Sequence, residues 1–198
     1  NGAVALQLTT AAGLSGDIDA RKRLTKRYQQ DNATRLANYA RMQRVLERIE
    51  REIPGARRAT DSSGRETDIA IDHSEFEHLD QTRIAAVVAL MHSEGMNATV
   101  SSIHVNGWFG THNKWQGAQW IVRELWGREL EAEVDQWAFI GDSTNDVLMF
   151  EAFPQSCGVA NVRRFEAQLT HRPRYVTNRE RGAGFTEVAQ ALLAARTT

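Results

Sequence analysis

The sequence contains one cysteine, almost no net charge and no long hydrophobic run, and each shortage excludes a class of protein. Cys157 alone cannot form an intramolecular disulfide, which favours a reducing compartment. The formal charge of −1 provides no overall attraction to nucleic acid or to an anionic membrane. No apolar run approaches the roughly 20 residues of a membrane span, and the first residues lack the basic start of a secretory signal. We therefore expect a cytoplasmic protein without nucleic-acid or membrane partners.

The six histidines do not have the spacing of a zinc site, since no two of them form a His-x3-His pair and Cys157 has no second cysteine. Cys157 stands in an apolar run beside Gly158, so we interpret it as a small buried residue rather than a nucleophile. Apolar residues make up 41% of the 198 residues, which is enough for a hydrophobic core.

The first half of the chain has the pattern of a small α+β unit. Residues 9–19 predict a loop, and residues 20–53 have helical periodicity that ends at Pro54-Gly55. The other face of this helix is basic; we interpret it as a solvated face, with an anion-binding stripe as the alternative. Further expected elements are a half-buried strand over 67–72, helical structure from the capping-box pair Ser74 and Glu77, and a helix through 84–91 that closes at Gly95. A strand over 98–105 follows, with the hairpin signal Asn106-Gly107 after it.

The second half alternates short apolar strands with helices, which is typical of a parallel sheet covered on both faces. The expected helices span residues 115–126, 147–152, 163–169 and 184–195, and Gly127 ends the first of them. The expected strands span residues 137–140, 157–160 and 175–177. The fold class is therefore α/β.

The most informative segment is Gly141 to Asp146, which follows the apolar strand. Ligands of open parallel sheets bind at the carboxyl ends of strands, so Asp142 is expected at the functional edge. Asp142 and Asp146 are hard oxygen ligands that suit magnesium. The amide of Asn145 and the Ser143 and Thr144 hydroxyls are candidates for hydrogen bonds to metal-bound water or to a phosphoryl oxygen. The competing interpretation is an ordinary strand-to-helix turn with a hydroxyl cap.

Lys114 stands at the start of the predicted helix 115–126. An ammonium group there opposes the helix dipole, which favours an anion instead. A phosphate between the two would relieve this conflict. Alone, Lys114 reads as an exposed lysine; next to the Gly141-Asp142 turn it becomes a candidate phosphate ligand.

Together, Lys114 and the run Gly141-Asp142-Ser143-Thr144-Asn145-Asp146 resemble the third and fourth motifs of the haloacid dehalogenase superfamily. The later runs 157–162, 174–178 and 182–185 are similar to the end of its sugar-phosphatase-like branch. The motif resemblance covers residues 114–186. It implies a Rossmann-like parallel-sheet core into which an α+β cap domain is inserted. By architecture alone, residues 1–11 would be the end of an N-terminal core segment, residues 12–110 the cap, and residues 111–198 the C-terminal part of the core.

The resemblance also implies roles for individual residues. Lys114 would steady the phosphoryl group and the charge of the nucleophile. Asp142 would bind Mg²⁺ directly, and Asp146 would support the metal site through water or hydrogen bonds. Asn145 would orient substrate or metal.

The nucleophile of that superfamily is the first aspartate of an Asp-x-Asp-x-Thr motif after a core strand. Asp17-Ile18-Asp19 has the Asp-x-Asp form, but no buried strand precedes it and Arg21 stands where threonine is expected. We therefore do not assign Asp17 as the nucleophile. The opening Asn1-Gly2-Ala3 resembles a stretch that follows the first two motifs, so we expect the nucleophile upstream of residue 1 and no phosphatase activity from residues 1–198 alone.

His104 and Trp108, with Asn106 and His112, surround the predicted hairpin and are candidate contacts for the leaving group; packing of the hairpin is the alternative interpretation. The expected function is Mg²⁺-dependent hydrolysis of a phosphorylated sugar or related small metabolite through an aspartyl-phosphate. A phosphomutase of the same architecture and a non-catalytic binding protein are the alternatives. The sequence does not indicate the oligomeric state.

Overall fold

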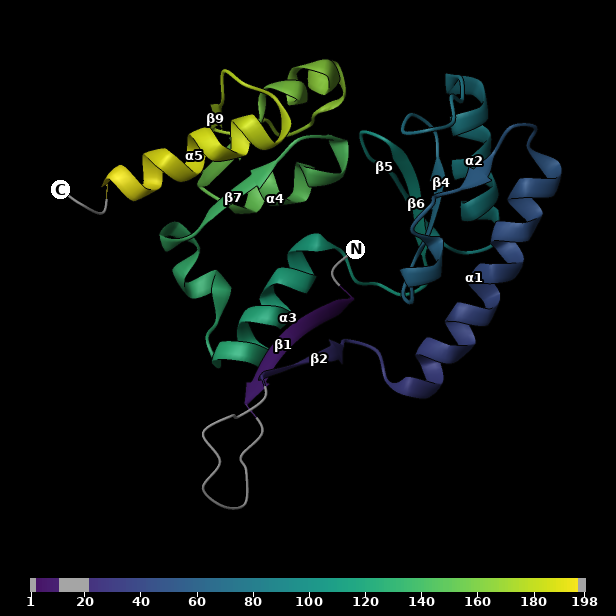
Figure 1. Ribbon diagram of the computed structural model, residues 1–198, viewed down its shortest axis with the longest axis horizontal. Helices are drawn as coiled ribbons and strands as arrows, with labels where there is room; N and C mark the ends of the chain where they lie inside the picture. The colour runs from purple at the N-terminus through teal and green to yellow at the C-terminus, as the bar shows by residue number, and fades with distance from the viewer. Residues whose placement is uncertain (1–2, 11–21, 196–198) are drawn as a thin grey trace.

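The computed structural model describes residues 3–10 and 22–195, which form a mixed α/β structure with three sheets (Figure 1). Strands β1 (Val4–Thr10) and β2 (Lys22–Tyr28) form an antiparallel pair. A four-stranded antiparallel sheet has the order β3-β4-β6-β5, and a three-stranded parallel sheet has the order β7-β8-β9. In the described part of the chain, no helix is long and apolar enough to cross a membrane.

The four-stranded sheet has one apolar face and one polar face. Its strands are β3 (Arg57–Arg58), β4 (Ile69–Asp72), β5 (Asn97–Val100) and β6 (His104–Trp108). Because side chains alternate along a strand, Ile69, Ile71 and Val105 share one face, where they are at most 2% exposed. They pack against helices α1 (Asn32–Glu52) and α2 (Gln81–Ser93) in one hydrophobic cluster. The sheet lies between these helices and the second half of the chain (Figure 1).

The second half contains the predicted parallel sheet. Its strands are β7 (Ala138–Gly141), β8 (Gln155–Gly158) and β9 (Tyr175–Val176), and its helices are α3 (Lys114–Trp126), α4 (Val147–Ala152) and α5 (Arg181–Ala195). Three 3-10 helices, η2 (Leu130–Gln136), η3 (Thr144–Asp146) and η4 (Ala160–Gln168), connect them. A second hydrophobic cluster joins Val122, Leu130, Met149 and Phe153. The predicted elements are confirmed, with their ends shifted by up to three residues and with 3-10 geometry in place of the helix over 163–169.

The single helix predicted over residues 20–53 is wrong in its first part. Residues Lys22–Tyr28 form β2, whose register pairs Val4 with Tyr28, and α1 begins at Asn32. Asp31 caps α1 by accepting the N–H of Thr34 at 2.9 Å. Leu24 and Tyr28 have helical spacing, but pairing with β1 places both in a strand. Leu24 is 63% exposed, so it does not form the buried face that the helix prediction required. Apart from Thr9 and Thr10 in β1, the predicted loop lies outside the described residues, as does Asp17-Ile18-Asp19.

The predicted hairpin at Asn106-Gly107 is also wrong, because both residues lie inside β6. The turn between β5 and β6 is at Ser101, Ser102 and Ile103. The Ser101 N–H donates to the carbonyl of His104 at 2.8 Å, and the Ser101 hydroxyl accepts the His104 N–H at 3.0 Å. Gly107 instead permits close packing on α2, since an added Cβ would lie 2.6 Å from the sulfur of Met91.

The Ser74–Glu77 pair does not start a helix. Helix α2 begins at Gln81, after its cap Asp80. The carboxylate of Asp72 organises the preceding loop by accepting four backbone N–H groups, those of residues 74 to 77, at 2.8–3.2 Å. All four residues of β4 are buried, including Asp72 at 2% exposure, so the expected half-buried strand is covered on both faces.

We predict that Asp72→Asn lowers the free energy of unfolding at pH 7 by about 2 kcal/mol, because an amide accepts hydrogen bonds less strongly than a carboxylate. Burial alone would raise the pKa of Asp72, but the four N–H donors outweigh it and lower the pKa. A carboxylate with a depressed folded-state pKa stabilises the fold above its unfolded pKa, and this contribution is lost as the pH falls through the folded pKa. The difference in the free energy of unfolding between mutant and wild type, measured by urea titration, should therefore become smaller in acid. A constant difference from neutral pH to pH 2 would contradict this role. Asp135→Asn, at an exposed site, is the control.

Candidate functional site at the carboxyl end of β7

The turn after β7 is held by the buried carboxylate of Asp146. One oxygen of Asp146 accepts the backbone N–H of Asp142 at 2.8 Å and that of Ser143 at 3.3 Å. Ser143 and Asp146 form a reciprocal capping box at 0% and 3% exposure. An added Cβ on Gly141 would lie 2.7 Å from the carboxyl carbon of Asp146, so the close approach of Asp146 needs glycine here.

Lys114 reaches this turn from the first position of α3. Its ammonium donates to Asn145 Oδ1 at 3.0 Å and forms an ion pair with the second oxygen of Asp146. The Ser143 hydroxyl donates to the same Asn145 oxygen at 3.0 Å. Asn113 caps α3 by accepting the N–H of Gln116 at 2.9 Å, which begins the helix where Lys114 faces the turn. The structure thus brings Lys114, Ser143, Asn145 and Asp146 into one hydrogen-bonded cluster.

Asp142 points to the other side of the turn. It accepts the Ser143 hydroxyl at 3.3 Å and the side-chain amide of Asn161 at 3.0 Å. Asn161 is 5% exposed and also accepts the backbone N–H of Arg181 at 3.1 Å, so it links β7 to the start of α5. Sequence reasoning did not select Asn161 as a site residue. The rule that selected Asp142 would have found it, because Asn161 follows β8 at the same edge of the sheet.

The candidate residues line two cavities on either side of the β5–β6 turn. The first, about 350 Å³, is lined by Lys114 and Asn145, by the predicted His104 and Trp108, and by Arg65, Asp68 and Asn106. The second, about 710 Å³, contains Asp142 and Asn161 together with His73, Glu75, Arg164 and Arg181. Ile103 lines both, and the Thr144 hydroxyl donates to the carbonyl of Val100 at 2.8 Å. The end of β5 therefore contacts the η3 turn, and Lys114 and Asp142 line different cavities.

The acceptor groups of the site fit a magnesium ion at Asp142 rather than at Asp146. Both oxygens of Asp146 are engaged by Lys114 and by backbone N–H groups, whereas each oxygen of Asp142 accepts one hydrogen bond and retains acceptor capacity. Within residues 3–10 and 22–195, no three His, Cys, Asp or Glu side chains gather as a complete metal site. One protein carboxylate with water and phosphate oxygens is a common magnesium environment, so the donor set fits this ion.

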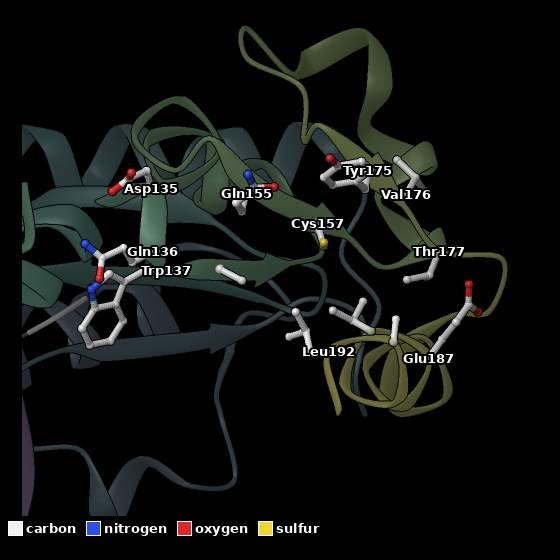
Figure 2. Close-up of a pocket in the computed structure, with 13 residues that line it drawn as sticks. Asp135, Gln136, Trp137, Gln155, Cys157, Tyr175, Val176, Thr177, Glu187 and Leu192 are labelled. Carbon is white, nitrogen blue, oxygen red and sulfur yellow. The ribbon is translucent and has the colours of Figure 1, made fainter. Parts of the chain in front are cut away.

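A separate apolar cavity of about 440 Å³ lies between the three-stranded sheet and α5 (Figure 2). Trp137, Tyr175, Val176 and Leu192 line it, and it contains no residue of the candidate site. Cys157 also faces this cavity, and burial raises the pKa of its thiol. Cys157 is only partly buried, so the expectation of a buried residue is corrected to a residue that lines a cavity. The raised pKa of its thiol makes it a poor nucleophile.

Solved structures are similar to the fold of this chain, although no family model and no curated protein sequence matches it. A protein from Thermoplasma acidophilum has a TM-score of 0.57 and 18% identity, covering 85% of this chain and 65% of its own. A sucrose-phosphatase from Synechocystis, solved with sucrose and phosphate, has a TM-score of 0.56 and 16% identity. The match covers 84% of this chain and 69% of the sucrose-phosphatase chain. A trehalose-6-phosphate phosphatase related protein has a TM-score of 0.54 and 11% identity. The match covers 88% of this chain and 68% of that protein's chain.

The chain has the fold of these solved structures, which is the haloacid dehalogenase fold. The expected α/β class, with a parallel sheet in the C-terminal part, is thereby confirmed. The chain spans about two thirds of the length of the haloacid-dehalogenase-type structures that it matches. At these identities the likeness establishes the fold, and the activity has to be argued from the site.

We predict that Gly141→Ala displaces Asp146 and loosens the turn, because the Asp146 side chain is buried and has no room to yield. The free energy of unfolding should fall by roughly 1–3 kcal/mol, as for other overpacked sites. The amide protons of Asp142 and Ser143 should exchange faster with deuterium, since Asp146 accepts both. Gly182→Ala is the matched control, because an added Cβ there meets nothing within 4 Å. Equal protection of both amides in Gly141→Ala and Gly182→Ala would show that the turn does not depend on this close approach.

Proposed function

We propose that this chain belongs to a magnesium-dependent phosphomonoester hydrolase that acts on a phosphorylated sugar or a related small metabolite. The observation that carries the proposal is the cluster of Lys114, Asn145 and Asp146 beside Asp142 at the carboxyl end of β7, in a fold shared with solved sugar phosphatases. A cation and a carboxylate on opposite sides of one turn suit a phosphate and the metal ion that accompanies it.

In this proposal, different residues of the site stabilise the charge of the phosphate and the charge of the metal ion. Lys114 contacts the phosphoryl oxygens, and Asp146 holds the ammonium in place. Asp142 and Asn161 provide the metal side, where Mg²⁺ when bound would act as a Lewis acid on the phosphoryl group. Asn145 and Ser143 supply hydrogen bonds to the phosphate. Asp146, which sequence reasoning also offered as a metal ligand, supports the site through the backbone of Asp142 instead.

The proposed nucleophile is an aspartate outside residues 1–198. Its carboxylate attacks phosphorus, the leaving-group oxygen departs with a proton from a partner aspartate, and water then hydrolyses the aspartyl-phosphate. Strand β7 is an edge strand of the three-stranded sheet, and within the described residues its outer edge pairs with no other strand. This position supports the proposal, since a strand added there would lie beside the strand that ends at Asp142.

We further propose that the unit from α1 to β6 acts as a cap over this site. Its hydrophobic cluster contains residues from Met42 to Phe109, whereas the second cluster, of Val122, Leu130, Met149 and Phe153, belongs to the second half. The pairing of β2 with β1 supports a cap that begins after β2 rather than at residue 12. Gln30 donates to the carbonyl of Phe109 at 3.1 Å, so the two connections between cap and core run side by side.

We predict that Asp142→Asn abolishes magnesium-dependent phosphate release from p-nitrophenyl phosphate by the natural full-length polypeptide. The amide removes the negative charge that would bind Mg²⁺ while preserving the shape of the side chain. Calorimetric titration with MgCl₂ should show weaker metal binding as a second readout. Asp135→Asn is the control for loss of a carboxylate. Turnover within threefold of wild type, with unchanged metal binding, would rule out this role for Asp142.

We also predict that Lys114→Ala lowers kcat by a factor on the order of 10², as expected for the loss of one preorganised electrostatic contact. The structure adds a stability effect, because Lys114 neutralises the buried carboxylate of Asp146. We expect about 1 kcal/mol, since the Lys114 side chain is 35% exposed and solvent screens the pair. The double variant Lys114→Ala/Asp146→Asn removes the unpaired charge and should recover stability without recovering turnover. If turnover returned together with stability, Lys114 would have a structural role alone.

A further inference from the structure

Helix α1 carries a row of four arginines that the proposed chemistry does not use. Arg41, Arg44, Arg48 and Arg51 are three or four residues apart, so they share one side of the helix, with neighbours about 5 Å apart along its axis. All four line one hollow of about 410 Å³, which we call the arginine hollow. Like charges at this spacing destabilise a helix. How each arginine is paired therefore decides between a solvated face and an anion-binding face.

Two of the four arginines are neutralised within the protein. Arg48 lies 3.1 Å from a carboxylate oxygen of Glu52 and also forms an ion pair with Glu94. Arg51 lies 3.0 Å from the same Glu52. Arg48 and Arg51 thus share two carboxylates, so this end of the row has no net charge for a ligand.

The other two arginines have no acidic partner. Among residues 3–10 and 22–195, the guanidinium groups of Arg41 and Arg44 form no ion pair and no hydrogen bond, and both residues are exposed. The Arg41 guanidinium lies 3.8 Å from the centre of the Phe109 ring. The face of an aromatic ring attracts a cation but does not neutralise its charge, and it leaves the N–H donors at the guanidinium edge without an acceptor. Arg41 and Arg44 therefore present two uncompensated positive charges.

One further carboxylate, that of Glu47, lines the arginine hollow. Glu47 follows Arg44 by three residues on the same side of the helix, but in the described part of the chain it forms no ion pair. One carboxylate beside two unpaired guanidinium groups lowers the positive charge of the hollow without removing it.

The arginine hollow is separate from the candidate site. Helix α1 packs on the face of the four-stranded sheet that carries Ile69 and Val105, whereas Asn106, on the opposite face, lines the cavity with Lys114. The sheet lies between α1 and the second half of the chain (Figure 1). An anion at Arg44 would therefore not be the phosphoryl group of the proposed reaction, and an inference about this hollow does not rest on that reaction.

We propose that the arginine hollow is a second anion site, which binds a phosphate dianion between Arg41 and Arg44. Two unpaired guanidinium groups match the charge of a dianion, and each planar group can donate two parallel N–H bonds to phosphate oxygens. A tetrahedral phosphate has oxygens for two donors one helical turn apart. A monocarboxylate carries half the charge and has fewer acceptors, so it binds less well. The volume of about 410 Å³ suits a small molecule rather than a polymer.

The experiment records the NMR signals of the arginine guanidinium carbons in the natural full-length polypeptide while inorganic phosphate is added at constant ionic strength. We expect saturable shifts of the Arg41 and Arg44 signals, which are assigned by their loss in single variants. The Phe109 ring protons should shift with the same concentration dependence, because Arg41 lies over that ring. Sodium acetate at the same ionic strength should give weaker shifts that do not saturate.

Three variants test which groups form the site. Arg44→Gln should weaken phosphate binding by roughly tenfold, and Glu47→Gln, which removes the opposing carboxylate, should strengthen it about threefold. Both positions are exposed, so the fold should survive. Arg57→Gln is the control and should leave binding unchanged, because Arg57 is exposed and lies outside the hollow.

Equal weakening by Arg44→Gln and Arg57→Gln would overturn the proposal, because it would show attraction to general positive charge. Shifts that grow linearly with phosphate, or that acetate reproduces, would likewise make α1 a solvated face. None of these results bears on the phosphatase proposal, whose Lys114 and Asp142 lie outside the arginine hollow. Conversely, absence of phosphatase activity would leave the predicted shifts at Arg41 and Arg44 in place.

Discussion

The carboxylate of Asp146 is the constraint on which the site depends. It is almost fully buried, and a buried carboxylate is tolerated when its oxygens accept hydrogen bonds and a cation lies beside it. Asp146 meets both conditions through the backbone N–H groups of Asp142 and Ser143 and through the ammonium of Lys114. One side chain therefore shapes the turn after β7 and sets the distance of α3 from that turn.

The same constraint separates the two halves of the proposed chemistry. Because Asp146 uses both oxygens inside the turn, it leaves Asp142 as the carboxylate with acceptor capacity toward the adjoining cavity. Lys114 lies on the opposite side of the turn, in the cavity formed with the polar face of the four-stranded sheet. The Thr144 hydroxyl donates to the carbonyl of Val100, which joins the η3 turn to the end of β5.

The polar face of the four-stranded sheet follows from simple alternation. Ile69, Ile71 and Val105 pack on α1 and α2, which forces Asp68, His104 and Asn106 to the opposite side. In an isolated domain such a face would be solvated. Here it faces Lys114 and Asn145 of the second half of the chain across a cavity, and its Asp68 is paired with Arg65 of its own unit. Burial thus turns an ordinary hydrophilic face into one with a defined charge balance.

The sequence by itself determined the parallel sheet, the placement of Asp142 and Lys114 at its edge, and the helices that follow. The signals for these features are local: short apolar runs predict the strands, glycines end the helices, and a carboxylate directly follows a strand. It selected His104 and Trp108 because they flank a predicted hairpin that does not form, and the structure places both in the lining of the cavity that contains Lys114. Tertiary structure alone decided that Lys22–Tyr28 is a strand, since its partner is β1, and that the β5–β6 turn precedes His104. The same holds for Arg65, Asp68 and Asn161. Asn161 contacts Asp142 from 19 positions away, and no local pattern encodes that contact. Arg65 and Asp68 form a local ion pair, but only the fold places them beside Asn106 and Lys114.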